Sequence, residues 1–145
     1  MTLKTCININ GREVGQYCQP YFVAEISGNH HQWIEQARVL IKSSKESGAD
    51  AVKLQTYTAD TLTLPIRNEQ YKAEGPWENA YLYDLYQNSY TPCEWHEELA
   101  LYAKKLGITI FSTPFDETSV DFLEKTINPP IYKIASFEVN HIPLL

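Results

Sequence analysis

The sequence predicts an α/β protein built around a parallel β-sheet, and two observations support this prediction. Short apolar runs typical of strands alternate along the chain with longer segments in which apolar residues recur at helical spacing. The strand-like runs are apolar at almost every position, as expected for parallel strands that are covered on both faces. These runs are residues 21–26, 51–56, 108–112 and 131–136.

A β-hairpin is predicted ahead of the first parallel strand. Its two strands alternate between apolar and polar residues and are joined by Asn10-Gly11, a strong signal for a two-residue hairpin turn. Pro20 interrupts the pattern before the first parallel strand begins. The predicted hairpin strands are residues 5–9 and 12–17.

Helices are predicted between the strands. The first is expected to end at Gly48, and Thr91-Pro92-Cys93-Glu94 has the pattern of a capping box that begins a helix ending at Gly107. The connection at residues 57–80 is long for a compact domain, which is typical of functional segments, and a short helix follows it. The predicted helices are about 32–47, 79–88 and 92–106, with a last one from Thr113 or Asp116 to about Lys125.

Two architectures fit alternating strands and helices, an open doubly wound sheet and a β/α barrel. No Gly-x-Gly-x-x-Gly follows the first strand, which disfavours a dinucleotide-binding sheet. A complete (β/α)8 barrel needs about 250 residues, so this chain would supply about half of one. We therefore expect the first four β/α units of a barrel at residues 20–145, preceded by the hairpin at residues 1–19.

The composition excludes several classes of function. The formal net charge is -6, the pI is about 5.2 and the lysines are scattered, which disfavours a nucleic-acid surface. No apolar stretch approaches the roughly 20 residues of a membrane helix. The N-terminus also lacks the basic and then apolar pattern of a signal peptide. We therefore expect a cytoplasmic protein that binds neither nucleic acid nor membrane.

Three of the predicted strands carry a charged residue where an apolar one is expected. Glu25, Lys53 and Lys133 lie in these strands, and burying such charges costs several kcal/mol unless each is paired or bound. The period of two places Lys53 and Gln55 on one face of their strand. If the apolar residues face the helices, the two lysines converge on the other face, where their repulsion would be relieved by a dianion such as phosphate.

These residues also have structural interpretations. Glu25 and Lys53 can form a purely structural ion pair, with Lys133 extending outward to solvent. Thr113 lies at a strand end before a helix, where its hydroxyl can hold an anion or simply cap the helix. Glu138 can transfer a proton or can be an exposed loop acid.

The four histidines do not show a metal-binding spacing such as HExxH. His30 and His31 follow the first parallel strand, at the end of the sheet where the site is expected, and one of them is a candidate for substrate contact. His96 lies inside a predicted helix and is interpreted as a surface or packing residue. No histidine is assigned as a metal ligand.

Four ordered motifs resemble the sialic acid synthase family, and the similarity runs from Tyr21 through almost the whole chain. They are Val23-Ala-Glu-Ile-Ser-Gly-Asn-His30, Gly48-Ala-Asp-Ala-Val-Lys-Leu-Gln-Thr-Tyr57, Phe111-Ser-Thr-Pro-Phe-Asp116 and Tyr132-Lys-Ile-Ala-Ser-Phe-Glu138. The stretches Gln55–Leu64, Leu82–Tyr86 and Thr91–His96 are similar to the pseudaminic acid branch of that family.

The resemblance implies a (β/α)8 barrel that condenses phosphoenolpyruvate with the open aldehyde form of an N-acetylated amino sugar, with Mn²⁺ or Mg²⁺ as Lewis acid. It implies that Glu25 contacts the sugar near the aldehyde and that Glu138 lies near the reacting centre with a role in proton transfer. Asn29, His30 and Gln55 are second-tier candidates for sugar contact. The phosphoenolpyruvate-binding set implied by the resemblance is Lys53, Thr113, Lys133 and Ser136.

The chain departs from the family pattern in its length. The family's metal-binding histidines come from later barrel strands, so the metal ligands are not expected within this chain. A half-barrel exposes sheet edges and apolar interior, so we expect self-association and no activity from the chain alone. Two alternatives remain open: another phosphoenolpyruvate aldol synthase, or an inactive half-barrel module that binds an anion or self-associates.

Overall fold

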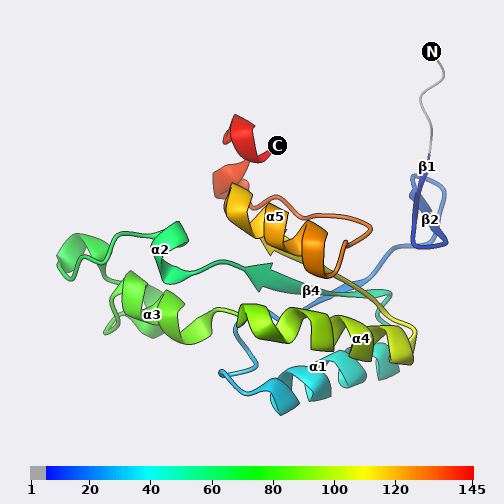
Figure 1. Cartoon of the computed structure of the whole chain (residues 1–145), viewed down its shortest axis with the longest axis horizontal. Coiled ribbons are helices and arrows are strands. Elements are labelled where there is room, and N and C mark those ends of the chain that lie inside the picture. The colour runs from blue at the N-terminus through cyan, green and yellow to red at the C-terminus, as the bar shows by residue number, and fades with distance from the viewer. Residues whose placement is uncertain (1–5) are drawn as a thin grey trace.

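The computed structural model describes residues 6–145 and has an α/β architecture (Figure 1). Its three-stranded parallel sheet confirms the predicted class, and β4 lies in the middle of it. A separate antiparallel hairpin precedes the sheet, as predicted, although residue 5 of the predicted hairpin lies outside the described residues. The strands are β1 (Cys6–Ile9), β2 (Arg12–Gly15), β3 (Val23–Glu25), β4 (Ala51–Thr56) and β5 (Thr109–Pro114).

Helices cover one face of the parallel sheet. The long helices α1 and α4 lie side by side beneath β4 in Figure 1, and the α2 and α3 segment extends beyond the end of the strand. Short 3-10 turns connect several of these elements. The helices are α1 (Ile34–Glu46), α2 (Ala59–Leu62), α3 (Leu82–Ser89), α4 (His96–Leu106) and α5 (Glu117–Thr126).

The apolar core lies between the sheet and the helices. Val52 and Leu54 of β4 are fully buried on the helix-covered face, as the period of two predicts. Burying a side chain of this size stabilises the fold by about 1.5–3 kcal/mol. The other members of the core cluster are Ile26, Ala37, Ile41, Leu99, Ala103 and Ile108.

The register of the sheet sets which side chains meet on its other face. Glu25 of β3 is paired with Lys53 of β4, and Gln55 is paired with Thr113 of β5. Paired residues in a parallel sheet point to the same side, so these four side chains share the face opposite the apolar core. This arrangement confirms the predicted face of β4.

Helix ends follow the predicted signals in most places. Gly107 ends α4 with φ +66°, a left-handed conformation that glycine adopts without steric strain. Asp116 caps α5 by accepting a hydrogen bond from the backbone N–H of Ser119 at 2.8 Å. This result decides between the two predicted starts of α5 in favour of Asp116.

The predicted capping box at Thr91 is wrong. The helix α4 begins at His96, after a 3-10 turn at Cys93–Trp95, and no side-chain cap is made there. Thr91 is buried, and its hydroxyl contacts His30 at 3.3 Å instead of the helix N-terminus. A tertiary hydrogen bond therefore takes the place of the expected local one.

The predicted strand at residues 131–136 is wrong as a strand. It makes one parallel bridge, between Tyr132 and Ser112, and the N–H of Lys133 donates to the Ser112 carbonyl at 3.3 Å. Pro129 and Pro130 lack N–H groups just before it, and a 3-10 turn follows at Ser136–Glu138. Within residues 6–145, this segment has a strand neighbour on one side only, at β5.

The hairpin contacts the N-terminal ends of the parallel strands. Asn10 donates to the hydroxyl of Thr109 at 3.1 Å, and Arg12 forms an ion pair with Asp50 just before β4. The hairpin therefore lies at the opposite end of the sheet from the C-terminal strand ends. None of the helices in residues 6–145 is long and apolar enough to cross a membrane.

Candidate functional site

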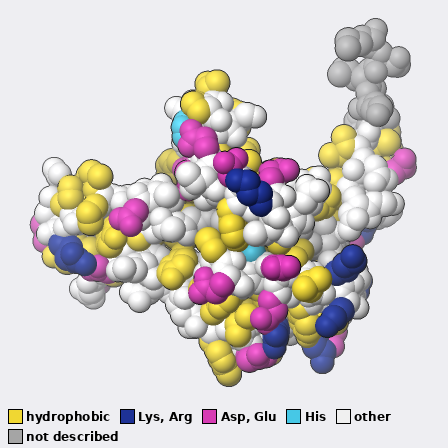
Figure 2. Space-filling view, viewed as in Figure 1, with side chains coloured by type: hydrophobic (Ala, Val, Ile, Leu, Met, Phe, Trp, Pro, Cys, Tyr) yellow, Lys and Arg dark blue, Asp and Glu magenta, His cyan; other side chains and the backbone are white. Residues whose placement is uncertain are grey.

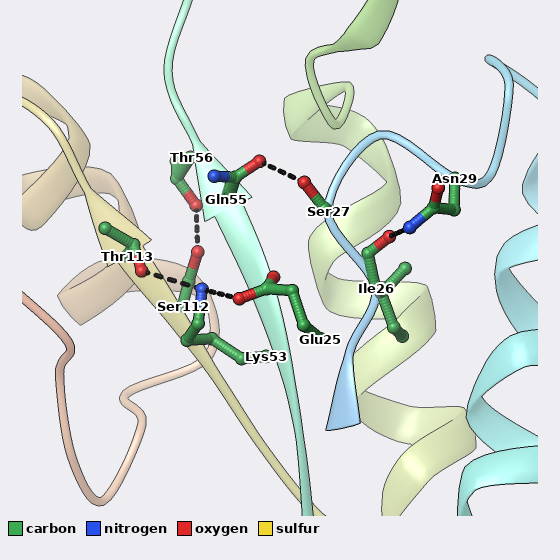
Figure 3. A network of polar contacts seen from close by, with 9 residues as sticks. All are labelled: Glu25, Ile26, Ser27, Asn29, Lys53, Gln55, Thr56, Ser112 and Thr113. Atoms are coloured by element: carbon green, nitrogen blue, oxygen red, sulfur yellow. Dashed lines mark hydrogen bonds and ion pairs between the residues drawn. The ribbon is translucent and has the colours of Figure 1, made fainter. Parts of the chain in front are cut away.

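Three side chains from three strands meet on the face of the sheet that the helices leave uncovered. The Lys53 ammonium forms an ion pair with the Glu25 carboxylate and donates a hydrogen bond to the Thr113 hydroxyl at 3.1 Å (Figure 3). The ammonium carries three hydrogens, so these contacts leave one for a further acceptor. The sheet register brings these groups together because Glu25 and Lys53 are direct partners.

Burial differs strongly across this ion pair. The Lys53 side chain is 10% exposed, whereas the Glu25 side chain is 47% exposed. A buried ammonium is stable only when its partners replace the water that it has lost. The Glu25 carboxylate therefore pairs with the largely buried Lys53 ammonium from the solvent side. A ligand can reach the ion pair where Glu25 is exposed.

A second polar pair lies beside the first. The hydroxyl of Ser27 donates to the side-chain carbonyl of Gln55 at 2.7 Å (Figure 3). Ser27 has φ +50°, which is strained for a residue other than glycine. The amide of Asn29 donates to the backbone carbonyl of Ile26 at 2.9 Å, which ties this exposed residue to its own loop.

His30 does not face this site. Its side chain is 0% exposed, its Nε2 contacts Thr91, and its Nδ1 accepts from the N–H of Gln32 at 3.2 Å. Its ring also packs edge-on against Trp95, with centroids 5.4 Å apart. The expected contact between His30 and a sugar is therefore corrected, because the imidazole is enclosed behind the loop.

Burial has a marked effect on this imidazole. Loss of water, reinforced by the nearby His31 and His96, lowers the pKa of His30 below its ordinary value. His30 is therefore neutral at physiological pH and supports the loop by hydrogen bonding and packing.

Lys133 is exposed, so the expected burial of two ammonium groups is wrong. Tyr132 points toward the helices, because its hydroxyl donates to Glu124 of α5 at 2.6 Å. Alternation then directs Lys133 to the other side, which is the side of Lys53 and Thr113. The structure thus brings Lys53 and Thr113 into contact and leaves Lys133 in solvent on their side of the sheet.

The remaining predicted residues lie in the 3-10 turn after this segment. Ser136 is exposed, and Glu138 is partly buried. The Oε2 atom of Glu138 is buried, and within residues 6–145 it has no hydrogen-bond partner. Neither residue hydrogen-bonds to Lys53 or Thr113 in this part of the chain.

These contacts also fit the structural alternative, in which Glu25 and Lys53 form an ion pair and Lys133 lies in solvent. The Lys53 ammonium also keeps one hydrogen for a further acceptor beside the Thr113 hydroxyl, as an anion site requires.

Sequence reasoning left His96 open as a surface or packing residue and missed the buried hydrogen bonds that it makes behind the site. His96 is 0% exposed and contacts the Thr56 hydroxyl at 2.8 Å, and Thr56 contacts the Ser112 hydroxyl at 2.7 Å. Desolvation lowers the pKa of His96. Its position three residues before Leu99 and seven before Ala103, both buried on α4, was the available signal that His96 faces inward.

Metal-binding groups do not gather in the described chain. Within residues 6–145, no three His, Cys, Asp or Glu side chains lie together in a way that could hold a metal ion. These residues therefore do not fit the divalent metal of the expected reaction.

Comparison with known proteins gives a consistent result. Residues 40–145 match the NeuB family. Pseudaminic acid synthase from Helicobacter pylori is 46% identical over 127 residues, which make up 87% of this chain and 37% of that protein. The chain thus spans little more than a third of the length of this relative.

Two crystal structures have a similar fold. Spore coat polysaccharide biosynthesis protein SpsE from Bacillus subtilis matches with a TM-score of 0.72 and 34% identity, over 96% of this chain and 36% of that one. N-acetylneuraminic acid (sialic acid) synthetase from Leptospira borgpetersenii, in complex with citrate, matches with a TM-score of 0.77 and 24% identity. That second match covers 96% of this chain and 44% of the other, and it shows likeness of fold.

Proposed function

Because the chain belongs to the NeuB family of sialic acid synthases, we propose that it carries the phosphoenolpyruvate-binding part of a nonulosonic acid synthase. The similarity to a pseudaminic acid synthase supports a sugar of the pseudaminic type as product. We further propose that residues 20–145 form the first four β/α units of a (β/α)8 barrel. The observation that carries the proposal is the largely buried Lys53 ammonium, which contacts both Glu25 and Thr113.

The proposed reaction joins two small molecules and releases phosphate. The C3 carbon of phosphoenolpyruvate forms a bond to the aldehyde carbon of an N-acetylated amino sugar, and the aldehyde oxygen takes a proton to become a hydroxyl. Water adds at C2 to give a tetrahedral intermediate. Inorganic phosphate then leaves with the bridging oxygen, and C2 becomes the ketone of the product.

In this proposal, the Lys53 ammonium and the Thr113 hydroxyl bind an anionic group of phosphoenolpyruvate. Lys53 supplies a charge that is poorly screened because it is buried, which strengthens its attraction for an anion. Lys133 and Ser136 lie on a flanking segment without a full strand pairing, and they approach the same anion from solvent. A second positive charge matches a dianion better than Lys53 alone, which Glu25 already neutralises.

The carboxylates have different proposed roles. Glu25 is half exposed at the edge of the site, where it contacts the sugar near the aldehyde. Glu138 moves a proton at the reacting centre, and its buried, unpaired Oε2 atom supports a partner supplied by substrate. Gln55 and Asn29 are proposed to contact the sugar, and His30 supports their loop from behind.

The divalent metal of this reaction, Mn²⁺ or Mg²⁺, would polarise the aldehyde. Within residues 6–145 the side chains do not form a site for it, so none of the roles proposed for them involves the metal.

Calorimetric titration with phosphoenolpyruvate tests the proposal. Lys53→Met keeps the length of the buried side chain and removes its charge, so we expect the Kd to rise at least about tenfold, as for loss of a charge-assisted contact. Lys42→Met is the matched control, because Lys42 is exposed on α1 and its charged partner is Glu46, at 3.7 Å. Equal affinity in both variants would support the purely structural ion pair and contradict the proposal.

A further inference from the structure

A buried hydrogen-bond chain lies on the helix-covered side of the sheet, directly behind the candidate site. His96 Nδ1 is 3.1 Å from the carbonyl oxygen of Pro92, and its Nε2 is 2.8 Å from the Thr56 hydroxyl. A carbonyl oxygen can only accept, so Nδ1 carries the proton and Nε2 accepts from Thr56. The neutral tautomer of His96 is therefore set by its two partners.

This tautomer determines which group donates and which accepts in each hydrogen bond of the buried series. Thr56 donates to His96, so its oxygen accepts from the Ser112 hydroxyl at 2.7 Å. Thr56 is 2% exposed, and Ser112 and His96 are 0% exposed. Hydrogen bonds in such a dry environment reinforce one another and hold their groups in one arrangement.

These side-chain hydrogen bonds link the C-terminal ends of β4 and β5. Thr56 is the last residue of β4 and is paired in register with Pro114, the last residue of β5. Proline has no N–H to donate to the sheet, so the backbone ladder is weakened at this point. The side-chain link from Thr56 to Ser112 joins β4 and β5 where the backbone offers fewer bonds.

The same strand ends carry the site on the opposite face. Gln55 precedes Thr56 and Thr113 follows Ser112, so alternation directs both of these side chains to the site face. Thr113 in turn accepts the hydrogen bond from the Lys53 ammonium at 3.1 Å. A shift of one strand end relative to the other would therefore move the Thr113 hydroxyl away from Lys53.

We propose that His96 is a positioning residue, which acts through Thr56 and Ser112 to set the spacing between Gln55 and Thr113 across the site. His96 itself is enclosed on the far face, where its ring packs edge-on against Phe122 with centroids 5.1 Å apart. The identity of the ligand rests on the function proposed above, whereas the geometric role of His96 does not.

Hydrogen–deuterium exchange of the strand ends tests the geometric role without any ligand. Thr56→Val and His96→Leu each remove the hydrogen bond between Thr56 and His96 with little change in side-chain volume. We expect the amides of residues 55–57 and of Ser112 and Thr113 to exchange about tenfold faster in both variants, while the N-terminal halves of β4 and β5 keep their protection. His96→Gln can still accept at the position of Nε2, so it is expected to restore most of the protection.

Two outcomes would overturn the proposal. One is unchanged exchange at the strand ends in Thr56→Val, and the other is an equal, sheet-wide loss of protection in His96→Gln and His96→Leu, as expected for a histidine that only packs. Ser112→Ala removes the hydrogen bond between Ser112 and Thr56 and gives the same test if Thr56→Val fails to fold. Thr126→Val is the control, because Thr126 is exposed and its hydroxyl donates to the Phe122 carbonyl within α5, away from the strand ends.

Calorimetry with phosphoenolpyruvate then connects the geometry to binding. We expect the Kd to rise about tenfold in Thr56→Val and to stay within about threefold of the parent protein in His96→Gln. An unchanged Kd in a Thr56→Val protein with loosened strand ends would contradict the role in binding. If the parent protein also fails to bind while the exchange results hold, the proposed ligand is wrong and the positioning role stands.

Discussion

At the scale of single residues, the loop after β3 depends on a glycine for a close contact. A Cβ atom placed on Gly28 would lie 2.8 Å from the Cβ of Ser89 and 2.9 Å from its carbonyl oxygen, at the end of α3. Both distances are shorter than real contacts allow. The loop that carries Asn29 therefore packs against α3 only because position 28 has no side chain.

Gly28→Ala should consequently separate the loop from α3. We expect a loss of about 1–3 kcal/mol in the free energy of unfolding, typical of overpacking, measured by urea denaturation. The exchange of loop amides at 27–32 should also increase. Ser47→Ala, an exposed change at the end of α1, is the control and should change stability by less than about 0.5 kcal/mol. Retention of full stability in Gly28→Ala would show that the loop can shift without penalty.

The two buried histidines predict a sensitivity to mild acid. Burial lowers the pKa of both His30 and His96 in the folded state, so below the ordinary value of about 6.5 the unfolded chain binds protons that the folded chain does not. Stability should be full above that pH and should fall toward pH 5, by at most about 1.4 kcal/mol per pH unit for each histidine.

Urea unfolding at several pH values between 5 and 8 measures this slope. His96→Gln should make the slope smaller, whereas Ser47→Ala, which changes an exposed residue without a titratable group, should leave it unchanged. Despite partial burial, which acts in the opposite direction, hydrogen bonds from Thr118 and Ser119 lower the pKa of Asp116, so this carboxylate stays ionised across the window. A flat profile from pH 8 to 5 would contradict the prediction.

At the scale of elements, the end of α4 isolates the conformational role of one glycine. Gly107 has φ +66°, and a Cβ atom there would meet nothing within 4 Å. Gly107→Ala should therefore destabilise the protein by about 1–2 kcal/mol through backbone strain alone. Gly107→Asn is the matched control, because asparagine tolerates the left-handed conformation, and it should be less destabilising in thermal or urea unfolding. Equal losses in the two variants would point to a different cause.

Elements with strong local signals could be predicted from the sequence. The strand at residues 51–56 and the helix end at Gly107 are confirmed, because an apolar run and a glycine cap are local properties. The pairing of Glu25 with Lys53 was foreseen as an alternative, since the same alternation places both on one face.

Features that depend on tertiary neighbours could not be predicted in the same way. Residues 131–136 have the composition of a strand, but pairing on one side and two preceding prolines leave only a single bridge. Thr91 has the identity of a capping residue, but a buried histidine takes its hydroxyl. Exposure of Lys133 likewise depends on which segments cover it, which no local pattern specifies.

At the scale of the whole molecule, apolar side chains remain in contact with solvent. Figure 2 shows hydrophobic groups on the projection formed by the C-terminal segment, and Phe137 is 92% exposed, Ile142 73% and Val139 65%. The strand β3 is also an edge of the sheet, with Val23 42% exposed. Unpaired edges and apolar patches of this kind favour association.

We therefore predict that the 145-residue chain self-associates. Sedimentation velocity should show an average mass that rises with concentration, and Phe137→Ser combined with Val139→Ser should shift the distribution toward monomer. Leu101→Ser, which changes an exposed apolar residue on α4, is the control and should have little effect. A single monomeric species at all concentrations would contradict the prediction.

We also predict that the chain alone does not turn over substrate, because the described residues form no metal site and the chain covers about a third of its relative. The assay measures phosphate release from phosphoenolpyruvate with a 2,4-diacetamido-trideoxy hexose and Mn²⁺. Full turnover by the 145-residue chain would contradict this prediction, whereas turnover only in a form of relative-like length would support it.

The hairpin of β1 and β2 has a practical consequence for binding measurements. Its contacts through Asn10 and Arg12 attach it at the end of the sheet remote from Lys53 and Thr113. A biosensor chip that captures the protein by a tether joined ahead of the hairpin would therefore present the face with Lys53 and Thr113 to the flowing analyte. Surface-based kinetics can thus be recorded without the immobilisation chemistry blocking the groups of interest.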